Sequence, residues 1–572
     1  MKDRAINTAM SLQERLEGWA RGGRGPLMAA IVAVLAGLPG LFLTPTIDRD
    51  EPRFAEATAQ MLETGDFVTI QFQDEPRFKK PVGIYWLQAA SVKLLSHAED
   101  REIWAYRLPS LLGAALAAAA CAWGASAFLS PGLSTVAGVA LGSGFVLSTE
   151  AFLATTDGVL AGAITLAMAA LGRLYLAQNG GPRAGRRTRA WFWLGLTVSV
   201  LVKGPVGPMV VGLALLTLGL WDRKWRWMLH LGWGWGLILI AALVGPWAMA
   251  ITVATDGDFW GAALGGDLAP KLVGGQESHG APPLTYALLA SLLIFPATLL
   301  LPAGLSSGWR NRLEPGVRFA IAWLVPAWIV FELVPTKLPH YPLPLFAALA
   351  WLIARALADP IGRLSRLVGA GLAAMAALVF AGVSVAAVVW LKVPAAWPAA
   401  IASAVAFLAA GGIGAHLLLR QTAGRGLVIA SGLGIVAHAV FWCGLATALT
   451  PLWPSNDTMI ALRRAGLDPR NGLTPGPITL AGYEEPSLIF ALGTATELGD
   501  GQTAADAIAD GRPVVVEGRQ QDAFVAALRA NGDAAQMVGA VHGFDYSNGK
   551  PVALRLFKPV LPELKSAPDS TP

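Results

Sequence analysis

The amino-acid sequence predicts an all-α polytopic membrane protein with a small α/β domain at its C-terminal end. Of the 572 residues, 54% are hydrophobic and only 14% are charged, whereas an average soluble protein has about 25% charged residues. About thirteen apolar runs approach the length of roughly 20 residues that a membrane-spanning helix needs. The composition turns polar near Pro451 and stays polar to the end of the chain.

This composition excludes several classes of protein. So few charges among so many apolar residues rule out a disordered chain, a nucleic-acid-binding protein and a string of soluble domains. The two cysteines, Cys121 and Cys443, both lie inside apolar runs. The chain therefore offers neither a disulfide framework nor a zinc cluster.

The predicted spans follow a charged N-terminal segment, 1–26, and make up a transmembrane part over about 27–450. The first run lacks a signal-peptide cleavage pattern and comes after a long charged segment, so we interpret it as a membrane anchor. The spans cover approximately 27–45, 104–128, 132–149, 153–177, 190–202, 205–221, 227–252, 283–303, 316–333, 341–358, 366–391, 397–419 and 425–448.

The placement of Lys and Arg predicts the orientation of these spans. If the N-terminus is cytoplasmic, alternation puts every basic cluster on the cytoplasmic side and only single lysines outside, as the positive-inside rule requires. The clusters are Arg183 with Arg186, Arg187 and Arg189; Arg223 with Lys224 and Arg226; Arg310 with Arg312; Arg363 with Arg366; and Arg420 with Arg425. The outer lysines are Lys203, Lys271, Lys337 and Lys392. Membrane topology therefore accounts for the net charge of +5. The same alternation of charge supports an odd number of spans.

Three segments on the predicted outer side do not fit plain spans. They are a first outer loop over about 46–103, a second over about 253–282, and a C-terminal domain over 451–558 that ends in a flexible tail, 559–572. Short apolar runs alternate with helix-like stretches in the C-terminal domain, which indicates an α/β fold. The runs are Ile478–Leu480, Val514–Val516 and Val552–Leu556, and the stretches are Ala504–Ile508 and Ala523–Leu528.

The first outer loop predicts two helices in the membrane interface. Asp50 and Glu51 begin a helical run that ends at Gly65. One face of this run is apolar, as in an interfacial helix, and carries Phe54, Thr58, Met61 and Leu62. The second helix follows Lys79-Lys80-Pro81 and carries Tyr85. In a simpler interpretation, Asp50 only caps a helix and the lysines only reach lipid head groups.

Three more polar groups fall at the outer ends of predicted spans: Asp157, the break at Lys203-Gly204-Pro205, and Lys337-Leu338-Pro339-His340-Tyr341. A carboxylate at the bilayer centre costs about 2.5–3.5 kcal/mol, and less near the interface, so Asp157 could also be structural. Tyr341 could belong to an aromatic belt. We treat these residues as one candidate site with the first outer loop because all are predicted on the same side of the membrane.

Four motifs resemble those of bacterial aminoarabinose transferases, which belong to the polyprenyl-phosphate-sugar glycosyltransferases of the GT-C fold and are related to protein O-mannosyltransferases. They are Asp50-Glu51-Pro52-Arg53-Phe54; Phe78-Lys79-Lys80-Pro81-Val82-Gly83-Ile84-Tyr85-Trp86; Lys203-Gly204-Pro205; and Lys337-Leu338-Pro339-His340-Tyr341. The resemblance implies an inverting transfer of a sugar from a lipid phosphate to an acceptor. It places that reaction on the periplasmic face of the bacterial inner membrane.

The resemblance also implies residue roles. Asp50 matches the catalytic carboxylate of the first loop and Asp157 a second important acid, and we add Glu51 as a third candidate. Lys80 matches the lysine that holds the carrier phosphate. The remaining candidates for substrate binding are Arg53, Tyr85, Lys203, Lys337 and Tyr341.

Two departures from the family pattern concern a metal. The family has Glu before the motif lysine, where this chain has Lys79, and Glu-His in the second outer loop, where Asp267-Leu268 stands. These positions can hold a metal in that subgroup. Here the candidate ligands of a divalent metal ion, the one cofactor considered, are Asp267, Glu277 and His279, and a histidine in a Gly-rich loop is more often a structural donor. The departures favour another sugar of the family over aminoarabinose.

The chemistry fits these residue types. A polyprenyl-phosphate sugar is already activated, and Lys80, Arg53 and Lys203 can stabilise the charge that grows on the departing phosphate. Asp50 can accept the proton of an acceptor hydroxyl, which contributes about 10²–10⁴-fold. With a phosphate acceptor, as on lipid A, Asp50 would instead orient the nucleophile. The expected partners are the lipid-linked donor, an envelope glycan, lipid A or protein acceptor, and membrane lipids, without nucleic acid.

Three alternatives remain open in the sequence. A secondary transporter or lipid-linked-sugar flippase also uses charges and broken helices, but usually at the midplane and often with repeated halves, and no repeat is visible here. An O-antigen ligase or polymerase shares the substrate class but would lack the Asp-Glu loop after the first span. A non-catalytic scaffold would use the C-terminal domain to recruit a partner.

Overall fold

The computed structural model describes the chain except residues 1–17, 19–22, 48, 271–279, 472–475 and 561–572. Most of the predicted N-terminal segment and of the C-terminal tail therefore lies outside the described residues. So do Lys271 and two of the candidate metal ligands, Glu277 and His279.

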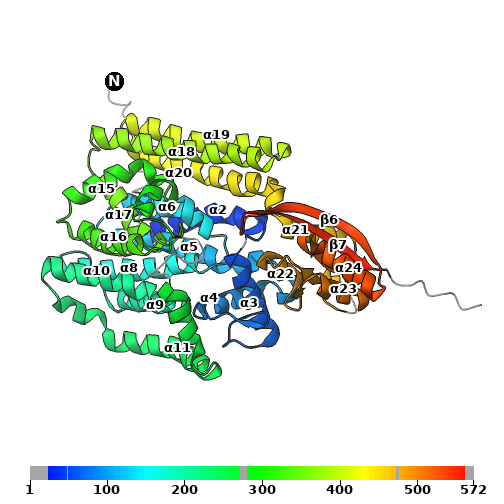
Figure 1. Ribbon diagram of the computed structural model, residues 1–572. Coiled ribbons are helices and arrows are strands. Elements are labelled where there is room, and N and C mark those ends of the chain that lie inside the picture. The colour runs from blue at the N-terminus through cyan, green and yellow to red at the C-terminus, as the bar shows by residue number, and fades with distance from the viewer. Residues whose placement is uncertain (1–17, 19–22, 48, 271–279, 472–475, 561–572) are drawn as a thin grey trace, which may run out of the picture.

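The molecule has a large helical part and a smaller domain with a sheet at one end (Figure 1). Eight helices are long and apolar enough to cross a membrane within the described ranges. They are α2 (Arg24–Leu43), α5 (Ile103–Ala125), α8 (Asp157–Gln178), α11 (Trp233–Ala254), α16 (Pro315–Leu333), α18 (Arg363–Leu391), α19 (Trp397–Leu419) and α20 (Ala423–Ala439), which continues as the π-helix η8 (Val440–Ala446). Among them, α18, α19 and α20 pack side by side along one edge (Figure 1).

The other five predicted segments are helical but are not single long apolar helices, so the predicted count of thirteen is not confirmed. The run 132–149 is split at Gly144, whose extended backbone interrupts the helix, and the run 283–303 bends by 116° near Pro296, where a helix cannot continue regularly. The elements are α6 (Pro131–Gly142), α7 (Phe145–Glu150), α9 (Arg186–Lys203), α10 (Val206–Asp222), α14 (Thr285–Leu293), η5 (Ala297–Leu300), α15 (Leu301–Arg310), η6 (Leu343–Leu345) and α17 (Phe346–Ala356).

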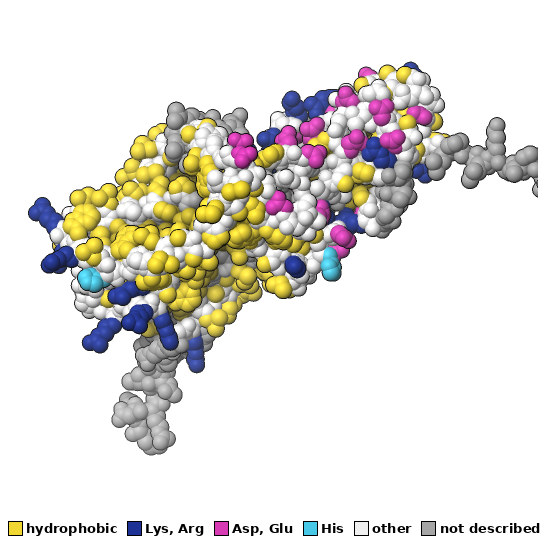
Figure 2. Space-filling model, turned by 90° about the horizontal axis from the view of Figure 1, so that it is seen from below, with side chains coloured by type: hydrophobic (Ala, Val, Ile, Leu, Met, Phe, Trp, Pro, Cys, Tyr) yellow, Lys and Arg dark blue, Asp and Glu magenta, His cyan; other side chains and the backbone are white. Residues whose placement is uncertain are grey.

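Charge is distributed unevenly over the molecule. Figure 2 shows Lys and Arg side chains gathered at the end far from the C-terminal domain, Asp and Glu mostly on that domain, and a hydrophobic surface between them. At the opposite end of α18 from its first residue, Arg363, the ring of Trp390 packs on Phe544 of the C-terminal domain, with centroids 4.9 Å apart. The arrangement fits the predicted topology, in which Arg363 is cytoplasmic and the domain lies outside.

Close contacts between small residues fix the start of α8 against α5. A Cβ atom on Gly113 would lie 2.5 Å from the carbonyl oxygen of Gly158, and one on Gly162 would lie 2.5 Å from that of Gly113. Larger side chains would push the two helices apart. The glycines therefore position Asp157, the first residue of α8.

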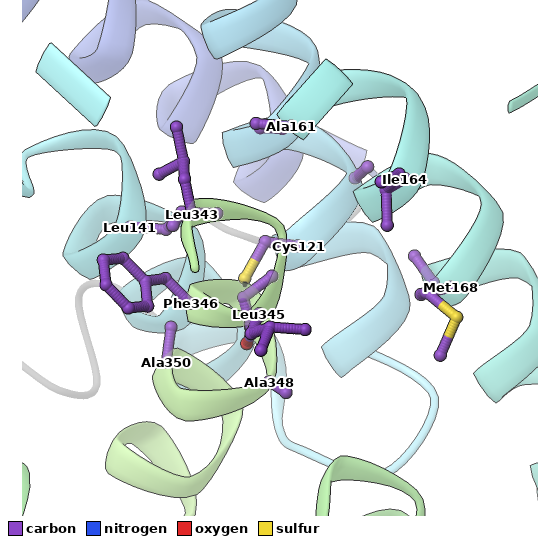
Figure 3. Close-up of a cluster of buried hydrophobic side chains, with 14 of the residues drawn as sticks. Cys121, Leu141, Ala161, Ile164, Met168, Leu343, Leu345, Phe346, Ala348 and Ala350 are labelled. Atoms are coloured by element: carbon purple, nitrogen blue, oxygen red, sulfur yellow. Dashed lines mark hydrogen bonds between the residues drawn. The ribbon is translucent and has the colours of Figure 1, made fainter. Parts of the chain in front are cut away.

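The segment after the Lys337–Tyr341 motif is anchored by apolar packing. Leu343, Leu345 and Phe346 gather with Cys121 of α5 and Leu141 of α6 in one buried cluster (Figure 3). The indole nitrogen of Trp351 also donates to the carbonyl of Cys121 at 2.9 Å. This packing fixes the end of the loop that carries Tyr341.

The first outer loop forms the two predicted helices, α3 (Asp50–Thr64) and α4 (Gly83–Leu95), joined by a short hairpin of β1 (Gln71–Phe72) and β2 (Glu75–Pro76). Helix α3 ends at Gly65, whose φ of 74° is the left-handed conformation that glycine adopts readily. Both predicted helix positions are confirmed.

Protein covers most of the surface of α3, because α4, α5 and the C-terminal helix α22 (Pro486–Leu492) pack around it. Ala55, Tyr106 and Phe490 belong to the same buried cluster. More than one side of α3 is thus buried, whereas the sequence predicted the burial of a single apolar face. Helix α4 does leave an apolar side exposed, at Leu87 and Leu94.

The C-terminal domain is the predicted α/β unit. Its five-stranded sheet has the order β4-β3-β5-β7-β6, in which β3 is parallel to β4 and β5, and β7 is antiparallel to β5 and β6. All three predicted apolar runs are strands and both helix-like stretches are helices. The elements are α21 (Pro454–Arg464), β3 (Thr479–Ala481), β4 (Glu497–Gly499), α23 (Gly501–Ala509), β5 (Val514–Glu517), α24 (Gln521–Asn531), β6 (Ala535–Asp545) and β7 (Lys550–Pro559).

Candidate active site

Asp50 is the first residue of α3, and its side chain is exposed. The cap position belongs to Arg49, whose side chain makes no capping hydrogen bond, so the interpretation of Asp50 as the helix cap is wrong. The negative charge of Asp50 raises the pKa of Tyr85 and of Tyr341, in each case after the larger effect of burial. The charge of Asp50 therefore reaches both tyrosines, which come from different loops.

Glu51 faces the opposite way and is buried. Its Oε1 accepts from Arg107 Nε at 2.7 Å and from the amide of Ala154 at 2.8 Å. Its Oε2 accepts from Arg107 Nη2 and from the amide of Ile47, both at 2.8 Å. Because four donors surround a carboxylate that is 2% exposed, Glu51 positions the loop and does not reach a substrate.

Asp157 belongs to a chain of charged groups. Its Oδ1 accepts from Lys203 Nζ at 2.7 Å, and its Oδ2 lies 3.7 Å from Nε2 of His340. The other ring nitrogen of His340, Nδ1, lies 3.2 Å from Glu150 Oε1. Burial lowers the pKa of His340, but Asp157 and Glu150 outweigh it, and the pKa lies above its ordinary value. The imidazole thus joins two carboxylates from α7 and α8.

Tyr341 lies beside this chain. The Nζ of Lys203 sits 5.2 Å from the centre of its ring, a distance typical of a cation–π contact. Burial raises the pKa of the phenol, and the charges of Asp157, Asp50 and Asp267 raise it further. One tyrosine therefore responds to carboxylates from three segments of the chain.

Lys80 follows the β1–β2 hairpin and forms an ion pair with Asp267 of the π-helix η4 (Gly261–Leu268), at 2.7 Å between Nζ and Oδ2. The ammonium also donates to the carbonyl of Lys79 at 3.1 Å. The pair joins the first and second outer loops. A phosphate at Lys80 would therefore have to compete with Asp267.

Lys337 does not point to this group of residues. Its Nζ donates to the carbonyls of Glu332 and Val334, at 2.9 and 2.5 Å, and lies 5.8 Å from the ring centre of Tyr286. A cation at the carbonyl end of a helix is stabilising, here at the end of α16. We therefore assign Lys337 to holding the loop.

Arg53 and Tyr85 complete the predicted set. Arg53 is half-buried and makes no ion pair with any residue that the structure describes. Tyr85 is buried on α4, and its ring packs on Phe54 with centroids 5.5 Å apart. Arg53 lies on α3, which begins with Asp50, and Tyr85 lies on α4, which follows Lys80.

Sequence reasoning missed Glu150, His340, Arg107 and Arg77 as site residues. A signal existed for two of them. Glu150 is a carboxylate inside an apolar run, which is rarely without function or partner, and His340 stands within a motif already singled out. Arg107 and Arg77 carry no local signal, because their importance depends on what lies around them in space.

The described residues do not fit a metal site. Asp267 is engaged by Lys80, and no three His, Cys, Asp or Glu side chains gather in an arrangement that could hold a metal ion within the described part of the chain. Glu277 and His279 lie outside it.

Comparison with known proteins supports the resemblance seen in the motifs. No family model matches the chain. It is 29% identical over 344 residues to an undecaprenyl phosphate-alpha-4-amino-4-deoxy-L-arabinose arabinosyl transferase of Pseudomonas paraeruginosa, covering 58% of this chain and 61% of that protein. A protein of the same name from an Enterobacter species is 30% identical over 335 residues, covering 57% and 58%. The match thus spans about three fifths of the length of these relatives.

Among solved structures, the crystal structure of ArnT from Cupriavidus metallidurans bound to undecaprenyl phosphate superposes with a TM-score of 0.72. The superposition covers 93% of this chain and 97% of that one, at 21% sequence identity. The agreement over nearly the whole chain shows that the two proteins share a fold, including the C-terminal domain.

Proposed function

We propose that this chain is an inverting glycosyltransferase that moves a sugar from a polyprenyl phosphate, such as undecaprenyl phosphate, to an acceptor of the cell envelope such as lipid A. The reaction takes place at the periplasmic face of the bacterial inner membrane. The names of the two relatives support the donor class, and the shared fold supports a common architecture for the site.

The observation that carries the proposal is the meeting of distant segments at Tyr341. Lys203 lies 2.7 Å from Asp157 at the start of α8 and 5.2 Å from the ring centre of Tyr341. The charges of Asp50 and Asp267, from the first and second outer loops, raise the pKa of the same phenol. Lys80 and Lys203 are paired with two of these carboxylates. Such a concentration of partly buried opposite charges, at the ends of apolar helices, is expected where a charged substrate reacts.

The cations can serve the leaving group. When the C1–O bond breaks, negative charge grows on the carrier phosphate, and an ammonium in a site of low dielectric stabilises it more than water would. Lys80 would exchange its contact with Asp267 for one with the phosphate. Lys203 is held in place by Asp157 at 2.7 Å, so it can act without moving.

Asp50 can serve the acceptor. Its side chain is exposed, whereas the neighbouring Glu51 is saturated with hydrogen bonds and holds the start of α3. Asp50 has no comparable structural role, so it is available to accept a proton from an acceptor hydroxyl or to orient an acceptor phosphate. No step of this scheme uses a metal, since the described residues do not provide a set of ligands.

The test is a transfer assay with the full-length protein in lipid vesicles, given undecaprenyl phosphate linked to different sugars and lipid A as acceptor. We expect product from the wild type with at least one donor and none above background from Asp50→Asn, with unchanged insertion and melting temperature. Turnover by Asp50→Asn near the wild-type rate would remove Asp50 from the mechanism. A second measurement compares the envelope glycans of a strain lacking the protein with those of its parent. Inactivity of the wild-type protein with every donor, together with unchanged envelope glycans in the deletion strain, would overturn the proposal.

A further inference from the structure

Arg77 is a buried cation without a counter-ion. It follows β2 in the first outer loop and is 8% exposed. Its backbone amide donates to Ile70 at 2.8 Å. Its guanidinium, however, makes no ion pair with any residue that the structure describes, and its Nε is buried without a hydrogen-bond partner.

The two other arginines with similarly low exposure show what a satisfied site looks like here. Arg107 binds Glu51 through two nitrogens and donates to four carbonyls near the end of α2. Arg101 binds Glu56 at 2.6 Å and Glu63 at 2.5 Å, and donates to Thr494. Because a buried charge is costly unless it is paired, Arg77 is the exception that needs an explanation.

An aromatic ring and a buried hydroxyl lie beside Arg77. Its guanidinium lies 5.0 Å from the ring centre of Phe54, which holds it in a defined position. The hydroxyl of Tyr85 is also buried and makes no hydrogen bond of full geometry, and Arg77 lies near enough for its charge and side chain to lower the pKa of this phenol, which burial raises. Two unsatisfied groups that can donate hydrogen bonds thus lie together.

The location connects these donors to the candidate active site. Arg77 precedes Lys80 by three residues, and Tyr85 responds to the charges of Asp50 and Asp267. Lys80 and Lys203 already have carboxylate partners. Arg77 therefore provides a positive charge that is not neutralised in the absence of substrate.

We propose that Arg77 and the hydroxyl of Tyr85 form an oxyanion subsite that binds a negatively charged group of the lipid-linked donor. The group is either the carrier phosphate or a carboxylate on the transferred sugar, because a guanidinium with a neighbouring hydroxyl suits both. The inference rests on the proposed function and extends it to the chemistry of the donor. The ligand supplies the counter-ion that the protein itself lacks.

The test uses purified full-length protein in lipid nanodiscs and three ligands: undecaprenyl phosphate, the same carrier with a neutral hexose, and the same carrier with a hexuronic acid. If the subsite holds the phosphate, Arg77→Gln should weaken all three affinities by about tenfold or more. If it holds a sugar carboxylate, only the hexuronic acid donor should bind more weakly. Tyr85→Phe should change the same affinities by about two- to tenfold.

The control separates binding from folding. Without ligand, Arg77→Gln should melt at or above the wild-type temperature, because it removes an uncompensated charge. Arg101→Gln, which breaks a buried ion pair, should melt lower. Should Arg77→Gln fail to fold, Arg77→Lys keeps the charge without the planar fork and is expected to bind the affected ligand severalfold more weakly.

Two results would contradict the inference in different ways. Unchanged affinities of Arg77→Gln and Arg77→Lys for all three ligands, with tight binding by the wild type, would overturn the subsite and leave the proposed function standing. A wild type that binds none of the three ligands would overturn both.

Discussion

Glu51 and Arg107 form a buried, two-point ion pair that fastens the first outer loop to α5, with Nε–Oε1 at 2.7 Å and Nη2–Oε2 at 2.8 Å. Arg107 also donates to the last carbonyls of α2 and to the residues that follow it. The end of the first span, the first outer loop and α5 therefore share one guanidinium. The buried Glu51 thus fixes the position of the neighbouring, exposed Asp50.

Glu51→Gln should destabilise the protein. The substitution leaves Arg107 buried with an uncompensated charge, and breaking a buried pair in this way costs about 3–5 kcal/mol. We expect a clearly lower melting temperature in detergent and a proportional loss of active protein. Arg53→Gln, on the same helix but without an ion pair to a described residue, is the control and should melt like the wild type. Equal melting of the two variants would contradict the role given to Glu51.

Substitutions of Lys80 and of Asp267 should affect donor binding differently. Lys80→Ala removes the cation and should weaken binding of undecaprenyl phosphate by about tenfold or more. Asp267→Asn removes the competing carboxylate, so the affinity should be unchanged or a few times tighter. The matched control is Asp258→Asn, an exposed carboxylate on the preceding turn α12 (Asp258–Trp260), which should leave binding unchanged. A large loss of affinity in Asp267→Asn would show that Asp267 itself contacts the donor.

His340 should make stability depend on pH. Burial opposes its charge, but Asp157 and Glu150 raise its pKa above the ordinary value of about 6.5. A histidine whose pKa is raised on folding contributes stability that is complete below its unfolded pKa and is lost as the pH rises through the folded pKa. We expect the melting temperature of the wild type to fall over this range above pH ~6.5, and His340→Gln to lack that fall. Parallel curves would contradict the assignment.

Glu56 should contribute a separate pH dependence at lower pH. Burial raises its pKa from 4.5 to about 7, although Arg101 and Thr494 lower it. The folded protein then binds a proton more tightly than the unfolded chain, so the contribution of Glu56 to stability declines as the pH rises from 4.5 to about 7. Glu56→Gln should flatten the melting curve in this window. An unchanged slope would mean that other groups cause it.

Hydrogen bonds of Thr494 link the C-terminal domain to the first outer loop, and their removal should loosen this contact. Its hydroxyl is shared by Glu56 and Glu63 of α3 at 2.7 Å each and accepts from Arg101. Thr494→Val removes these hydrogen bonds at nearly constant volume and should lower the stability by about 1–3 kcal/mol, because the buried carboxylate of Glu56 loses a donor. Limited proteolysis between the last span and the domain should become faster. Thr503→Val, within the domain, should not change that rate.

The sequence alone determined the features that depend on short stretches of residues. Apolar length and charge placement predicted a membrane protein with a polar domain at one end, and alternating runs predicted the strands and helices of that domain. Gly65 predicted the end of α3. The motifs around Asp50, Lys80, Lys203 and Tyr341 indicated which loops belong to the candidate site, because each motif is a local pattern.

Only the tertiary structure decided the partners. Nothing near Glu51 in the sequence distinguishes it from Asp50, and its burial follows from Arg107, 56 residues away. The pairing of Lys80 with Asp267 joins residues 187 positions apart, and Arg77 lacks the carboxylate partners that Arg101 has. Helix length shows the same limit, since Gly144 and Pro296 interrupt runs that look continuous by hydropathy. Burial and ion pairing are properties of the packed chain, whereas apolar length and turn residues act locally, and the sequence reveals only what acts locally.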